Sequence, residues 1–148
     1  MRVPPAERPP ALHNGRVAVP DAVPHDDPYL QRIREIALTF PGAQEKRSVG
    51  HPSFFTKKVF VWVGMAAKVD DEWVRYPHSI AFFLPEHERA AILEHPKGYL
   101  PGYIGPWGWV GMHLDEDTDW DEVRELIEES YRTTAGKKLI AELDSRTA

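Results

Sequence analysis

Hydrophobic residues recur at helical spacing after the first 27 residues of the chain. The apolar stripe consists of Leu30, Ile33, Ile36, Ala37 and Phe40. Asp27 precedes this stripe, where its carboxylate can accept hydrogen bonds from free backbone N–H groups, and Pro28 fits the first helical position. The pattern therefore predicts a helix that begins at Asp27-Pro28 and ends at Pro41-Gly42.

Further helices are predicted in the second half of the chain. Pro85 occupies the first turn of one of them, and residues 90–93 provide its apolar side. The next has Thr118 as its N-cap and ends near Gly136, which suits the left-handed position that closes a helix. Its apolar face consists of Trp120, Val123, Ile127 and Tyr131. Residues 137–143 are expected to form a last short helix.

Alternating and continuous apolar runs predict strands in the middle of the chain. Residues 58–63 alternate valine with Phe60 and Trp62, so both faces carry bulk and the strand is expected to be central. Similar runs are found at residues 73–76, 79–84 and 109–114. The glycine-rich residues 97–108 are expected to be a loop. Because the strands cluster with short links, we expect an α+β fold in which helices back an antiparallel β-sheet.

Composition favours one folded domain with an N-terminal arm. The chain has 148 residues, of which 42% are hydrophobic and 28% are charged, as in ordinary globular proteins. Seven of its 14 prolines fall in the first 28 residues. We therefore expect residues 1–27 to be a proline-rich arm and residues 28–148 to be the domain. The sequence shows no signal-peptide pattern and no apolar run long enough to span a membrane, so a cytoplasmic location is expected.

The usual motifs of catalysis and metal binding are missing from the sequence. The absence of cysteine excludes disulfides, thiolate catalysis and cysteine-ligated metals. No two of the seven histidines have the spacing that places two ligands on one helix face. The acidic residues 115–122 fail the EF-hand pattern at the glycine and closing-glutamate positions, and favour a helix N-terminus instead. We predict no catalytic residue, no cofactor and no metal site.

Charge is distributed unevenly along the chain. The net charge is −5, yet residues 44–58 carry a local net charge of +3 and residues 115–129 one of −8. Basic side chains can contact phosphates, and exposed aromatic rings can stack on bases. The sequence therefore favours a non-enzymatic domain that binds DNA weakly. The residues predicted for this surface are Lys46, Arg47, Lys57, Lys58, Arg75, Lys97 and Trp107.

Other functions remain open at this point. A small-molecule or metal-binding protein would use a pocket formed by the aromatic loop and the histidines. That pocket would contain Glu45, His51, Tyr103, Trp107, Trp109 and His113. A protein-interaction module is a third hypothesis, and the charged segments could also be two solvated faces. The sequence is compatible with a monomer or a homodimer.

Several short motifs follow one another in a fixed order between residues 29 and 143. They are Phe40-Pro41-Gly42, Glu45, Gly50-His51-Pro52-Ser53-Phe54, Lys58-Val59-Phe60, Pro85-Glu86-His87-Glu88-Arg89, Gly105-Pro106-Trp107-Gly108-Trp109-Val110-Gly111 and Glu129-Ser130-Tyr131-Arg132. Together they resemble the MmcQ/YjbR family.

This resemblance implies a CyaY-like (frataxin-like) two-layer sandwich and a DNA-binding role without a known reaction. The chain departs from the family pattern at two places. Phe82-Phe83 stands where many members have a lysine, and Trp107 stands where many have a polar or basic residue. Both departures reduce the positive surface that the resemblance implies.

Overall fold

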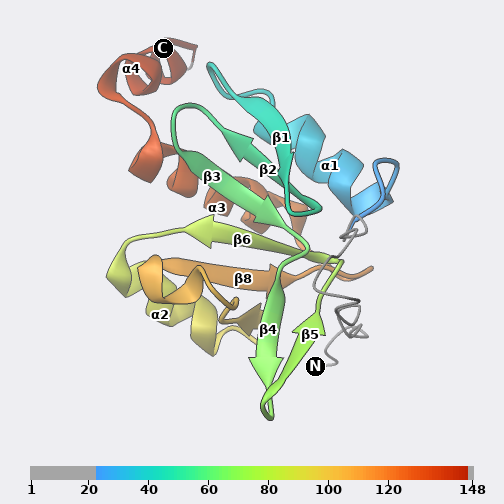
Figure 1. Cartoon of the computed structure of the whole chain (residues 1–148). Coiled ribbons are helices and arrows are strands. Elements are labelled where there is room, and N and C mark those ends of the chain that lie inside the picture. Colours follow the sequence, from blue (N-terminus) through green and yellow to red (C-terminus); the bar gives the residue numbers. More distant parts are fainter. Residues whose placement is uncertain (1–22, 147–148) are drawn as a thin grey trace.

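The chain folds as a six-stranded sheet with helices on one side, in a computed structural model that describes residues 23–146 (Figure 1). The helices are α1 (Pro28–Ala37), α2 (Glu86–Glu94), α3 (Trp120–Thr134) and α4 (Lys137–Arg146), with a 3-10 turn η1 (Gly105–Trp107). The strands are β1 (Gln44–Ser48), β2 (His51–Phe55), β3 (Val59–Val63), β4 (Ala66–Val69), β5 (Glu72–Arg75), β6 (Ser79–Phe83), β7 (Gly98–Tyr99) and β8 (Trp109–His113).

The main sheet is antiparallel throughout, in the order β1-β2-β3-β6-β8-β7. β4 and β5 pair only with each other and form a separate hairpin. This hairpin connects β3 to β6 along the chain and projects from the main sheet. The prediction of an α+β fold with an antiparallel sheet and a central β3 is therefore confirmed.

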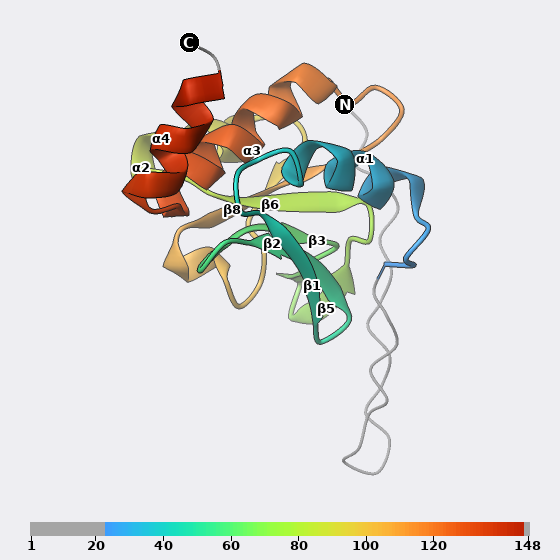
Figure 2. The ribbon, with the colours of Figure 1, turned by 90° about the horizontal axis from the view of Figure 1, so that it is seen from above.

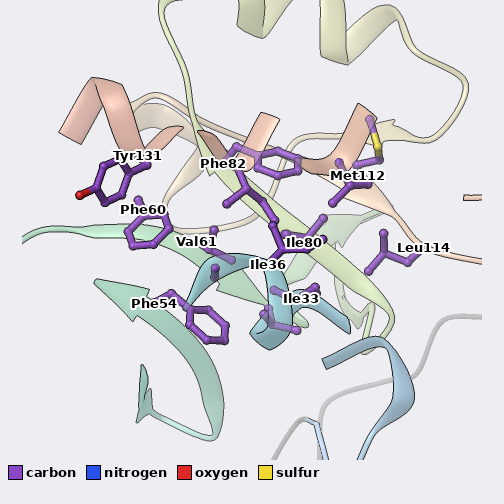
Figure 3. Close-up of a cluster of buried hydrophobic side chains, with 14 of the residues drawn as sticks. Ile33, Ile36, Phe54, Phe60, Val61, Ile80, Phe82, Met112, Leu114 and Tyr131 are labelled. Carbon is purple, nitrogen blue, oxygen red and sulfur yellow. The ribbon is translucent and has the colours of Figure 1, made fainter. Parts of the chain in front are cut away.

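Figure 2 shows the four helices on one face of the sheet. All four contribute side chains to the core on that face. Side chains from α1 and α3 meet those of β2, β3, β6 and β8 in this core, which Figure 3 shows. The phenol of Tyr131 packs edge-on against Phe60 and donates a hydrogen bond to the Pro41 carbonyl at 2.6 Å. The apolar face predicted for α3 is therefore the face that it buries.

A smaller cluster lies on the opposite face of the sheet. It contains Met65, Ala81 and Trp109, with Val59 and Phe83 among the half-buried residues against it. Side chains alternate along β6 and β8, so Ala81, Phe83 and Trp109 point away from the face that carries Phe82 and Val110. The strand residues that point away from the helices thus still form an apolar surface.

Helix ends differ from the prediction at several positions. The Asp27 carboxylate caps α1 as predicted, with hydrogen bonds from the amides of Tyr29 and Leu30. However, Asp119, not Thr118, caps α3, because its side chain accepts from the amides at the helix start while the Thr118 hydroxyl accepts from the Asp115 amide.

One further helix prediction was wrong. α3 ends at an extended Ala135, so Gly136 does not close it with a left-handed backbone. In α2, only Ile92 of the apolar residues 90–93 is buried. That helix covers the β7–β8 edge of the sheet, where a single side chain suffices to reach the core.

Four strands were not predicted, namely β1, β2, β4 and β7. β1 consists of Gln-Glu-Lys-Arg-Ser, so it has no apolar alternation to detect. The short strand β7 and the turn η1 both lie in the segment expected to be a loop.

Most of the arm predicted for residues 1–27 is outside the described residues. Within it, Val23 is fully buried in the main core.

Candidate functional site

A pocket of about 440 Å³ opens at the end of the sheet where β3 begins, β6 ends and β8 begins. Its apolar walls are Val59, Phe83, Trp107 and Trp109, and its remaining lining is Lys58, Thr133 and Thr134. Trp107 is 77% exposed, whereas Trp109 is buried. The pocket therefore offers a wall of packed rings and one large aromatic side chain held out in solvent.

A second pocket of about 580 Å³ adjoins the first, between the β2–β3 turn and the α3–α4 junction. The two pockets share Lys58, Thr133 and Thr134. The second pocket adds Thr56, Lys57, Ala135, Gly136, Lys138 and Leu139. We call the two adjoining pockets together the lysine groove. Figure 1 shows the turn and the helix junction side by side.

The charge of the lysine groove contrasts with that of the whole chain. Its lining includes Lys57, Lys58 and Lys138, and no carboxylate. Lys57, Lys58 and Lys138 are all exposed. In a chain with a net charge of −5, this is a local concentration of positive charge that suits an anionic ligand.

Local backbone geometry holds the two tryptophans on either side of Gly108. η1 places Pro106 and Trp107 in a tight turn, and Gly108 follows with φ at +106°. The Leu84 amide donates to the Gly108 carbonyl at 3.4 Å, which ties the turn to the residue after β6. Trp109 then begins β8 opposite Phe83, and the two rings tilt against each other at 5.6 Å.

The structure brings together three of the seven residues predicted for nucleic-acid contacts. Lys57, Lys58 and Trp107 line the lysine groove. Lys46 is exposed on β1, where its ammonium lies over the Phe55 ring at 4.6 Å from the centroid. Arg75, at the end of β5, lies outside the groove lining.

The other two predicted cations serve the fold. The Arg47 guanidinium donates to the Val23 carbonyl at 2.6 Å. Lys97 is buried, and its ammonium is 2.7 Å from an Asp115 carboxylate oxygen. That hydrogen bond holds the pKa of Asp115 below its usual value. We therefore leave Arg47 and Lys97 out of the surface proposed below.

The alternative pocket predicted from the sequence does not gather in one place. Only Trp107 and Trp109 line the lysine groove. Tyr103 is 73% exposed and stacks on Trp73, with ring centroids 4.5 Å apart. Glu45 accepts two hydrogen bonds from Arg34, at 2.6 and 2.9 Å, and thereby joins β1 to α1. Those bonds lower the pKa of Glu45.

The two histidines of that set lie in different environments. His113 is buried and stacks on Tyr99 at 4.7 Å, with Tyr76 edge-on at 4.6 Å. Burial lowers its pKa to about 4. His51 begins β2, where burial lowers its pKa and the nearby Arg75 charge adds to that effect. Both rings are therefore neutral at pH 7.

A third pocket, of about 290 Å³, lies beside the start of α3. Its lining includes His95, Asp117, Asp119 and Glu122, and the His95 ring is 3.3 Å from a Glu122 oxygen. Within residues 23–146, no group of three or more His, Asp and Glu side chains has the geometry to hold a metal ion. Across the same residues, no helix has the length and apolar character needed to cross a membrane.

Sequence reasoning missed most of the residues that line the lysine groove. Val59 and Phe83 were assigned to strands, and Thr133 and Thr134 to a helix end, without any site role. Lys138 was also absent from the predicted surface. The Lys137-Lys138 pair after Gly136 was a visible signal, but nothing in the sequence places it near Lys57.

Comparisons with known proteins agree with the motifs. A crystal structure of a protein from Pseudomonas syringae is similar in fold, with a TM-score of 0.56 at 15% identity, over 71% of this chain and 97% of that one. No curated protein matches the sequence. The family model described as YjbR matches residues 38–133. This match covers β1 to nearly the end of α3, so the chain belongs to the YjbR family.

Proposed function

We propose that this chain is a nucleic-acid-binding module that contacts DNA phosphates through the lysine groove. The observation that carries the proposal is the groove lining, which has three lysines and no carboxylate in an acidic chain. Phosphate contacts from lysine supply most of the sequence-independent affinity of DNA-binding proteins. The small number of lysines favours weak binding.

The proposal also includes a CyaY-like arrangement, a cytoplasmic location and the absence of catalysis. The helix layer on one face of an antiparallel sheet supports the CyaY-like arrangement. The groove lining supports the absence of catalysis in the groove, because it contains no His, Asp or Glu to transfer a proton at neutral pH. A monomer presents the groove fully, and a homodimer that leaves this end of the sheet free would do so as well.

Fluorescence anisotropy of a labelled DNA, titrated with protein from low to physiological salt, tests the proposal. We expect affinity to fall linearly in log salt, and the double variant Lys57→Glu/Lys58→Glu to bind at least about tenfold more weakly. The matched control is Lys68→Glu/Arg124→Glu, which makes the same change in net charge at exposed positions outside the groove. Absence of binding at low salt, or equal loss in both double variants, would refute the proposal.

A further inference from the structure

We propose that the lysine groove takes one unpaired nucleotide, with its base in the aromatic pocket and its phosphate in the adjoining lysine pocket. This inference rests on the proposed function and narrows it from phosphate contacts to a class of ligand. It predicts that single strands bind better than duplexes. Three features of the groove support it.

The first feature is the aromatic pocket. Phe83, Trp109 and Val59 provide an apolar wall, and Trp107 stands at its edge with 77% of its surface exposed. A tryptophan so exposed has lost little water on folding, and a flat aromatic partner would cover it. A volume of about 440 Å³ lies within the range of about 300–1,000 Å³ that is typical of small-molecule sites.

The second feature is the position of the charges relative to this pocket. Lys58 lines both pockets, so it lies at their junction, where a sugar-phosphate group would leave the aromatic wall. Lys57 and Lys138 line the far part of the groove. A ligand that spans both pockets therefore needs an apolar, planar part at one end and an anionic part at the other. A nucleotide has both.

The third feature is geometric. In a duplex the faces of each base are stacked on its neighbours, so a base can reach a protein ring only by leaving the stack. The aromatic wall lies in an open hollow between η1 and the end of α3. Duplex DNA could touch the lysines but not place a base against Phe83 and Trp109. Base stacking adds affinity only for unpaired nucleotides.

Anisotropy with three labelled ligands and one competition experiment tests the inference on the full chain. The ligands are a single strand, the same strand with abasic sites and the matching duplex, and unlabelled adenosine monophosphate or ribose 5-phosphate competes with the single strand. We expect the single strand to bind about tenfold more tightly than the abasic strand and the duplex. We expect adenosine monophosphate to compete better than ribose 5-phosphate.

Two variants test whether the Trp107 ring causes the preference for single strands. Trp107→Ala should weaken binding of the single strand about tenfold and leave binding of the duplex unchanged. Tyr103→Ala is the matched control, since it removes an aromatic ring of similar exposure that does not line the groove. Because both side chains are exposed, circular dichroism should show that both variants fold.

The outcomes separate this inference from the proposed function. Equal affinity for single strand, abasic strand and duplex, with loss only on charge reversal of Lys57 and Lys58, would overturn the inference and leave phosphate binding intact. Binding of adenosine monophosphate without binding of any DNA would support the nucleotide site and refute the proposed function. If neither adenosine monophosphate nor any DNA binds, both the inference and the proposed function are refuted.

Discussion

Gly108 shows how one residue sets the shape of the lysine groove. Its φ of +106° lies in a region that residues with a Cβ rarely adopt. A Cβ built there would also lie 2.8 Å from Cε1 of Phe83, which is a wall of the aromatic pocket. Both the backbone and the space therefore require glycine between Trp107 and Trp109.

We predict that Gly108→Ala lowers the free energy of unfolding by about 1–3 kcal/mol, because of backbone strain and the contact with Phe83. Urea denaturation followed by circular dichroism measures the change. Gly136→Ala is the control, since no atom lies within 4 Å of a Cβ at that position. Equal urea midpoints for the two variants would contradict the strain argument.

At the scale of elements, one buried serine fixes α3 to the sheet. The Ser130 hydroxyl donates to the Phe60 carbonyl of β3 at 2.6 Å and accepts from the Phe83 amide of β6 at 2.8 Å. It thereby satisfies two backbone groups where β3 and β6 meet the helix. Without the hydroxyl, both groups would lose their partner away from water.

We therefore expect Ser130→Ala to destabilise the fold by about 1–3 kcal/mol, the cost of leaving a buried polar group unsatisfied. The measurement is the melting temperature by calorimetry. Ser145→Ala makes the same chemical change at an exposed position of α4, so its effect should be within experimental error. A Ser130→Ala chain as stable as the wild type would show that water replaces the hydroxyl.

The start of α1 gives a second prediction for an element. The Asp27 carboxylate accepts from two helix amides and lies 3.0 Å from Nε2 of His78. We predict that Asp27→Ala costs about 1 kcal/mol of stability through loss of the N-cap. Asp27→Asn keeps a capping oxygen and should cost less. Equal losses in urea titrations of the two variants would mean that the charge, not the cap, stabilises this helix start.

Element patterns explain which parts of the fold the sequence predicted. The core faces of α1 and α3 and the strands β3, β6 and β8 were predicted because each buries a repeating apolar stripe. β1 was missed because its polar residues are held by pairing with β2, where Glu45 lies opposite Phe54. A strand at the edge of a sheet needs backbone partners more than apolar side chains, and local patterns do not reveal such partners.

For the whole molecule, the site depends on contacts that no local pattern encodes. Lys57 was predicted as a site residue because of its charge and Trp107 because its ring can stack on a base, yet several of their neighbours in the groove come from α3 and α4. Lys97 had the same charge but lies buried beside Asp115. Residue type alone could not separate a lysine that faces solvent from one that stabilises the fold.

The buried histidines make stability depend on pH. Burial lowers the pKa of His113 from 6.5 to about 4, so the unfolded chain binds more protons between these values. Stability from this residue is fully present above pH 6.5 and is lost as pH falls towards 4. The total contribution is about 3 kcal/mol. His51 acts in the same direction.

We predict that the free energy of unfolding falls between pH 7 and pH 5, and that His113→Gln reduces this slope. Urea titrations at several pH values measure it. His87→Gln, at an exposed position of α2, should leave the slope as it is in the wild type. An unchanged slope in His113→Gln would show that this ring titrates normally in the folded chain.

The lysine groove also has a consequence for the order in which the chain is made. Lys58 and Lys138 are 80 positions apart, and α4, which carries Lys138, is the last helix described. Synthesis runs from the N-terminus, so a growing chain holds every strand of the sheet well before it holds the third lysine. At that stage the chain has the sheet and only Lys57 and Lys58 of the three groove lysines, so the positive charge of the groove is completed last.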